Sequence, residues 1–122
     1  MVKPKTLNGM DWRECKMAIK DLPREECYIP GSAACPGCPA TMALRILFKA
    51  IGKNMVMSVP ACCTSVIESL HPKTSFNIPV MNIAFEAAAA GASGIEAGLR
   101  KQGKTDTTVV AVSYTHLTLP TN

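Results

Sequence analysis

Two cysteine pairs constrain this chain more than any other feature of its sequence. Cys35 and Cys38 enclose Pro36-Gly37, and a second pair, Cys62-Cys63, follows later in the chain. Two thiols three positions apart can bind one metal centre with little backbone strain, and a third thiol joins them only if the fold brings it back. Thiolate is a soft ligand that suits zinc, copper(I) or an iron–sulfur cluster. The sequence therefore predicts a fold that returns Cys63 to the first pair.

Composition excludes several classes of function. With 122 residues, 48% of them hydrophobic, the chain has the size and apolar content of one domain. The net charge of +4 is dispersed and only 5% of residues are aromatic, which argues against nucleic-acid binding. No apolar stretch approaches the ~20 residues of a membrane span, and no apolar leader follows the first lysines. Six cysteines without an export signal indicate a cytoplasmic protein whose thiols are free or metal-bound.

The pattern of apolar residues predicts an α/β fold with a parallel sheet flanked by helices. A first helix should begin at Pro39, which suits the first helical position, and stop at Gly52. The further expected elements are a buried strand at 55–59, a helix at 65–70, a long helix at 82–101 and a central parallel strand at 107–111. Gly91, Ser93 and Gly94 weaken the long helix, so another backbone or a ligand should approach it closely.

The chain divides into three parts by character. Residues 1–33 form a polar N-terminal arm, and residues 34–111 carry the predicted helices and strands. Residues 112–122 are similar to a translated sequencing adapter and interrupt the last strand in mid-run. We therefore expect this tail to be foreign to the native protein.

Four stretches, in order, resemble the start of the β subunit of 2-oxoacid:ferredoxin oxidoreductases, above all the pyruvate enzyme (pyruvate synthase). They are Pro30–Ala40 with the first cysteine pair, Ala43–Arg45, Pro60–Val66 with the second pair, and Asn82–Ala89 leading into Ala92–Ala97. The resemblance covers about residues 21–111.

The resemblance implies a partial thiamine-diphosphate-binding fold and a redox function. Members of the family bind thiamine diphosphate with Mg²⁺ and a [4Fe–4S] cluster, and decarboxylate a 2-oxo acid such as pyruvate. The acyl group goes to coenzyme A and the electrons go to ferredoxin, within a complex of several subunits. By position, Cys35, Cys38 and Cys63 match three of the four cluster ligands.

One family motif has no counterpart here. The family's Gly-Asp-Gly, whose aspartate helps hold Mg²⁺ on the diphosphate, should follow the strand that Val109-Val110-Ala111 resembles, but the adapter-like tail begins there. We therefore assign no catalytic residue and no Mg²⁺ or diphosphate ligand, and expect the fragment alone to be inactive.

Other readings of the cysteines remain open. Cys35, Cys38, Cys62 and Cys63 could form the four-thiolate zinc site of a small interaction module. The Cys35–Cys38 motif could instead be a reactive dithiol, although such a motif should follow a strand.

Three further residues carry expectations of their own. Cys15 and Cys27 should be unliganded. Glu86, on an otherwise apolar segment, should contact another subunit or the cofactor, or form an ion pair with Arg45 or Arg100.

Overall fold

The computed structural model describes residues 22–112 and has a three-stranded parallel sheet at its centre. The strand order is β2 (Val80–Ile83), β1 (Met55–Pro60), β3 (Thr108–Ala111), so β1 is the middle strand. Met57 lies opposite Val80 on one side and opposite Val110 on the other. Because all three strands are parallel, Pro60, Ile83 and Ala111 end at the same edge, which we call the carboxyl edge. This confirms the predicted α/β class.

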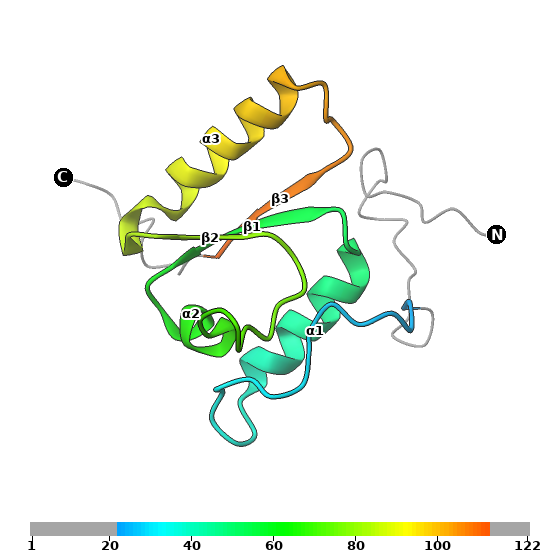
Figure 1. Cartoon of the computed structure of the whole chain (residues 1–122), viewed down its shortest axis with the longest axis vertical. Coiled ribbons are helices and arrows are strands. Elements are labelled where there is room, and N and C mark those ends of the chain that lie inside the picture. The colour runs from blue at the N-terminus through cyan, green and yellow to red at the C-terminus, as the bar shows by residue number, and fades with distance from the viewer. Residues whose placement is uncertain (1–21, 113–122) are drawn as a thin grey trace, which may run out of the picture.

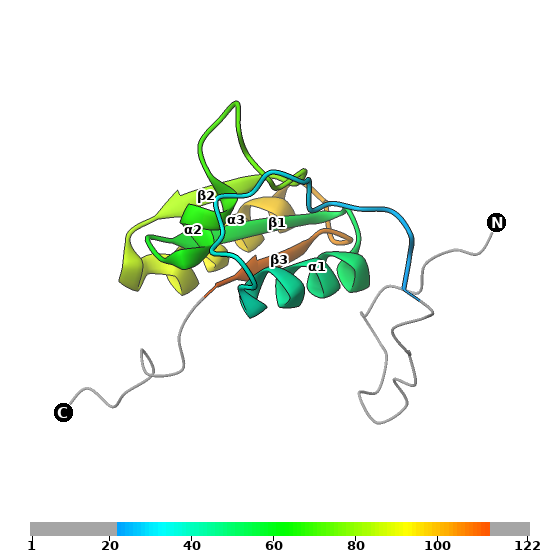
Figure 2. The same cartoon turned by 90° about the horizontal axis from the view of Figure 1, so that it is seen from below.

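Helices cover both faces of the sheet. Helix α1 (Pro39–Ile51) and the short helix α2 (Cys63–Glu68) lie on one face, and α3 (Ala88–Lys101) lies on the other (Figures 1 and 2). A single 3₁₀ turn, η3 (Phe85–Ala87), leads into α3. None of the helices in the described part is long and apolar enough to cross a membrane.

The boundaries of α1 confirm their sequence signals. Pro39 occupies the first turn, where its missing N–H would have had no helical partner. Gly52 ends the helix at φ 86°, a left-handed conformation that suits glycine, and its N–H donates to the Phe48 carbonyl at 2.8 Å.

The core lies between β1 and the α1/α2 layer. Met57 and Val59, alternate residues of β1, point into it and are fully buried. Leu44 and Phe48 from α1 and Ile67 from α2 belong to the same cluster. Three rings join separate segments there: Phe48 packs edge-on to Phe76 with centroids 5.0 Å apart, and Tyr28 of the arm lies 5.8 Å from Phe76.

Ion pairs attach the arm to α1. Glu26 contacts Arg45 at 2.6 Å and Lys49 at 2.7 Å, and the neighbouring Glu25 pairs with Lys53. The two cationic partners on α1 lower the pKa of Glu26 to about 2 through hydrogen bonds. The arm therefore lies along the helix, and the described part of it, residues 22–33, forms no helix.

The long helix expected at 82–101 is wrong in its first part. Residues 80–83 form strand β2, and only from Ala88 is the chain an α-helix. A continuous apolar run fits a buried strand as well as a buried helix, and pairing with β1 decided between them. Residues 107–111 are a strand as expected, but in the described sheet β3 lies at the edge and β1 is central. The Val112 N–H extends the ladder by donating to the Ser58 carbonyl at 3.0 Å, whereas residues 113–122 lie outside the described part.

Gly91 confirms the close approach expected of α3. A Cβ built there would lie 2.6 Å from Ile83 Cδ1 and 2.8 Å from Met81 Cε, both on β2. It would also lie 3.2 Å from the hydroxyl of Ser58, which donates to the Ala88 carbonyl at 3.1 Å. Gly94 has open space around it, and Ser93 is exposed. Of the three positions expected to allow a close approach, Gly91 is therefore the one that makes it.

We expect Gly91→Ala to be less stable than Gly94→Ala by about 1–3 kcal/mol. Both substitutions gain helix propensity of up to ~1 kcal/mol, so their difference isolates the packing at β2. Urea denaturation of the two variants measures it. Equal unfolding free energies would show that Ile83 and Met81 rearrange without cost.

Candidate functional site at the carboxyl edge of the sheet

The fold places both cysteine pairs at the carboxyl edge. Helix α1 ends just before β1 begins and packs back along that strand. The start of α1 therefore lies toward the carboxyl end of β1, and Cys38 comes directly before this start. Cys63 is the first residue of α2, three positions after Pro60 ends β1. In both views the segment before α1 and helix α2 lie side by side (Figures 1 and 2). In open parallel sheets this is the edge where ligands bind.

The first pair sits on a tight turn. The Cys38 N–H donates to the Cys35 carbonyl at 3.1 Å, and the Thr41 hydroxyl donates to the Cys38 carbonyl at 2.7 Å. Cys35 is exposed, whereas Cys38 is half-buried and packs against the core cluster. The turn thus presents one thiol to solvent and anchors the other at the start of α1. An irregular arm precedes it, as the sequence indicated, and not the strand expected before a reactive dithiol.

Cys35, Cys38, Cys62 and Cys63 are all free thiols, which is the donor chemistry that a soft metal centre needs. Within residues 22–112, however, no three side chains of His, Cys, Asp or Glu converge closely enough to hold a metal ion together. The donor set suits a thiolate-bound centre by its chemistry, but, contrary to the prediction from the sequence, the fold does not bring Cys63 close enough to Cys35 and Cys38 for the three to share a metal ion. The ligand set Cys35, Cys38 and Cys63 stays a prediction.

Cys62 differs from its neighbour in both surroundings and bonding. It is the N-cap of α2, where its N–H donates to the Ser65 hydroxyl at 3.2 Å, while Cys63 is exposed. This cap explains why the helix expected at 65–70 begins two residues earlier. Cys27, by contrast, is buried in the core, and desolvation raises the pKa of its thiol.

A cavity of about 300 Å³ opens beside α2 at the carboxyl edge, and we call it the edge hollow. Its lining residues come from the end of β1, from α2 and its C-terminal flank, and from the end of β2: Ala61, Ser65, Val66, Ser69, Leu70, Asn82 and Ile83. After β1 the chain turns to the α1/α2 face, and after β2 it turns to the α3 face (Figure 1). Such a divergence at the carboxyl edge is the position typical of ligand sites in α/β sheets.

Glu68, at the end of α2, is a buried acid next to this hollow. Its side chain is 6% exposed, and its Oε1 accepts a hydrogen bond of 3.3 Å from Asn82 Nδ2. Its Oε2 has no hydrogen-bond partner among the described residues. Burial raises the pKa of Glu68 above the usual 4.5, opposed by the bond from Asn82. Nothing in the local sequence marked Glu68, because its burial follows from how α2 packs.

This raised pKa predicts that Glu68 lowers stability as pH increases. Well below pH 4.5 the folded and unfolded chains both hold the proton. Above it the unfolded chain releases the proton first, so folding becomes less favourable until pH passes the higher folded pKa. We expect the unfolding free energy of Glu68→Gln to decrease less over this range, measured by urea denaturation from pH 4 to 8. Parallel pH profiles for the two proteins would contradict the prediction.

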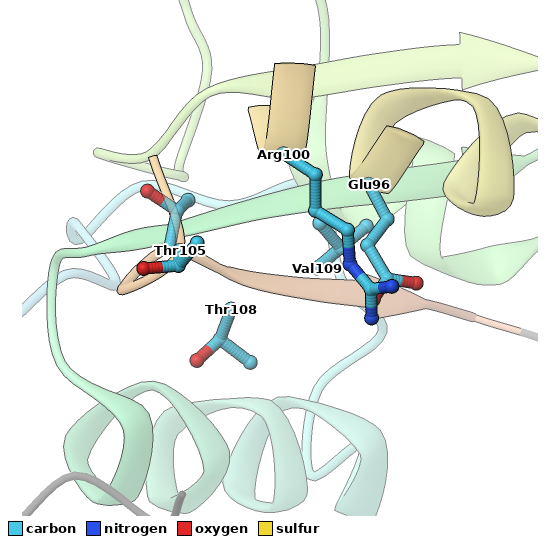
Figure 3. A pocket seen from close by; sticks show the side chains of 6 residues that line it. Glu96, Arg100, Thr105, Thr108 and Val109 are labelled. Atoms are coloured by element: carbon cyan, nitrogen blue, oxygen red, sulfur yellow. The ribbon is translucent and has the colours of Figure 1, made fainter. Parts of the chain in front are cut away.

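A second cavity of about 300 Å³ lies away from the cysteines, where β3 begins. It is lined by Glu96, Arg100, Thr105, Thr107, Thr108 and Val109. Figure 3 shows Arg100 and Glu96 reaching together from α3, and their charged groups bond at 2.5 Å. The charges thus satisfy each other, and the cavity lies at the amino ends of the strands. It carries none of the predicted site residues.

The ion pair expected for Glu86 is wrong. Arg45 pairs with Glu26 and Arg100 pairs with Glu96, while Glu86 is exposed on η3. Its contact with another subunit or the cofactor stays a prediction.

Comparison with known proteins identifies the segment. The chain is 43% identical over 90 residues to pyruvate synthase subunit PorB of Methanothermobacter thermautotrophicus, covering 74% of this chain and 31% of that protein. PorB of Methanocaldococcus jannaschii is 41% identical over 92 residues, covering 72% of this chain and 31% of the relative. Ketoisovalerate oxidoreductase subunit VorB of Pyrococcus abyssi is 40% identical over 82 residues, covering 67% and 26%.

The similarity covers only part of the length of each relative. This chain spans about 31% of the length of the curated PorB proteins it matches, and no protein-family model matches it. At 34–43% identity over about 70% of its residues, the chain is a PorB-like β-subunit segment.

Proposed function

We propose that this segment belongs to the β subunit of a 2-oxoacid:ferredoxin oxidoreductase, and that Cys35, Cys38 and Cys63 bind a [4Fe–4S] cluster in it. The similarity to PorB and VorB supports the family. The observation that carries the site is the placement of both cysteine pairs at the carboxyl edge, on the starts of α1 and α2. These are free thiols where an α/β sheet binds its ligands.

The chain's own residues would hold the cluster from two elements. Cys38, anchored in the core at the start of α1, fixes the turn that carries Cys35, while Cys63 comes from α2. Bound cofactors would supply the difficult chemistry: thiamine diphosphate with Mg²⁺ for decarboxylation, and the cluster for single-electron transfer. No described residue is assigned to Mg²⁺ or the diphosphate. The fourth cluster ligand would lie outside this segment.

Pyruvate is the proposed 2-oxo acid, because PorB relatives are named as pyruvate synthase subunits. VorB is named for ketoisovalerate, so the segment by itself does not select the substrate. The proposed partners are the other subunits of the complex, with coenzyme A as acyl acceptor and ferredoxin as electron acceptor. The proposed location is the cytoplasm.

Anaerobic reconstitution of the reduced chain with iron and sulfide tests this function. We expect bound iron with acid-labile sulfide and broad visible absorption, below full occupancy because three thiolates leave one iron without a protein ligand. Colourless stoichiometric zinc in preference to iron would favour the four-thiolate interaction module. A metal-free chain that forms a reversible disulfide between Cys35 and Cys38 would favour a dithiol redox protein.

A further inference from the structure

We propose that the outer side of strand β3 and the adjacent flank of helix α1 form one association surface, and that a second copy of this chain covers it. The surface carries none of the cysteines and needs no bound cofactor. Its backbone groups and its apolar side chains both lack a covering element among residues 22–112.

The outer side of β3 presents unpaired backbone groups. The Val112 N–H donates to the Ser58 carbonyl at 3.0 Å, so Val112 and every second residue before it face β1. Successive residues of a strand direct their N–H and C=O groups to opposite sides, so Val109 and Ala111 face away from β1. Among residues 22–112, β3 lies at the edge of the sheet and no strand pairs with its outer side.

The composition of this edge leaves it open to pairing. Residues 107–112 are β-branched apart from one alanine, and they include no charged residue and no proline. Natural edge strands are commonly blocked by a charged side chain, a proline or a bulge. An uncharged edge can also lie against an identical edge without repulsion between like charges. The outer side of β3 therefore favours the addition of a further strand.

The flank of α1 on the same side of the molecule is apolar. Arg45 and Lys49 lie on one flank of α1 and contact Glu26 of the arm. The arm bridges to the segment before β2, on the β2 side of the sheet, whereas α1 lies on the β3 side (Figure 2). The flank opposite Arg45 and Lys49 therefore faces outward past β3. Its residues recur at helical spacing and are exposed or half-buried: Ala43, Ile46, Leu47 and Ala50.

A two-fold axis at Val110, perpendicular to the sheet, lets the surface cover itself. Antiparallel pairing of two β3 strands sets Val109 of one copy opposite Ala111 of the other, so each outward N–H meets a carbonyl. The same axis brings the apolar α1 flanks of both copies to one face of the joined sheet. Because both copies use the same surface, the contact closes as a dimer. This self-complementarity favours a second copy as the occupant.

Sedimentation velocity of the reduced 122-residue chain over a concentration series tests the dimer. We expect a monomer–dimer equilibrium with a dissociation constant below ~1 mM. Ala111→Pro removes an outward N–H from both copies but no bond to β1, and should weaken the dimer at least about tenfold. Ala111→Val keeps that N–H and should dimerise like the unsubstituted chain.

A second pair of variants tests the α1 flank. Ile46 is 36% exposed, and Ile46→Glu puts a charge on the apolar flank, so it should weaken the dimer at least about tenfold. Leu70→Glu makes the same kind of change at a residue that is 80% exposed but lies in the edge hollow, and it should leave the dimer unchanged. This pair decides the question if Ala111→Pro does not fold, which circular dichroism shows.

Each contrary result overturns the proposal. A chain that is still monomeric at ~1 mM, or that forms only larger assemblies, has no two-fold contact of this kind. Equal dimerisation of folded Ala111→Pro and Ala111→Val would exclude pairing through β3. Equal weakening by Ile46→Glu and Leu70→Glu would place the contact elsewhere. No iron is added, so failure here leaves the proposed function standing, and failure of reconstitution leaves the dimer standing.

Discussion

Phe48→Ala is expected to destabilise the chain by about 3–5 kcal/mol, the usual cost of removing a buried aromatic side chain. Phe48 is 1% exposed, and its ring packs edge-on to Phe76 and 6.5 Å from Tyr28. These rings come from α1, from the segment before β2 and from the N-terminal arm. The substitution therefore leaves a cavity where three segments meet. A loss of this size is a large part of the ~5–15 kcal/mol that stabilises a typical domain.

Two further variants keep the Phe48 prediction testable if Phe48→Ala does not fold. Phe48→Leu retains most of the volume and should cost less than the alanine variant. Met42→Ala changes a residue of the same helix that is 61% exposed, and should alter stability by no more than ~0.5 kcal/mol. Urea denaturation compares all three. Equal losses for Phe48→Leu and Met42→Ala would indicate that the aromatic cluster does not stabilise the fold.

Removal of any one proposed cluster ligand should reduce bound iron by at least about tenfold. Loss even of a residue that supports a metal ligand commonly costs 10–100-fold in affinity, and loss of a ligand should cost no less. The variants are Cys35→Ser, Cys38→Ser and Cys63→Ser, each measured against the unsubstituted chain after anaerobic reconstitution. Iron and sulfide per chain, together with visible absorption, give the result.

Cys27→Ala is the matched control for these thiol variants. It also removes one free thiol, but from the buried core. We expect its iron content to equal that of the unsubstituted chain once both are folded. Full iron retention in Cys63→Ser would remove that residue from the ligand set, and a tenfold loss in Cys27→Ala would show that the assay reports folding and not ligation.

Local signals predicted several elements because their cause is local. Proline at the start of α1 and glycine at its end each act through their own backbone, so both boundaries were confirmed. The segment 80–87 gave no such signal. Its apolar residues suited either a helix or a strand, and the choice was made by β1, which is more than twenty residues away in sequence.

The candidate site shows the same division. The spacing of Cys35 and Cys38 marked them as potential ligands, because two residues on one turn are close whatever the rest of the chain does. The buried Glu68, its bond to Asn82 and the edge hollow carried no sequence signal. Each depends on α2 packing beside β2, which no local pattern encodes.

The sequence by itself determined the class of the fold, the starts and ends of α1, the cysteine chemistry and the resemblance to the β subunits. Only the tertiary structure decided that β1 is central, that both cysteine pairs share one edge, and that Cys62 is half-buried at the start of a helix while Cys63 is exposed. The physical reason is that propensity and ligand chemistry belong to single residues. Strand pairing, burial and the direction of a side chain arise from contacts between segments far apart in the chain.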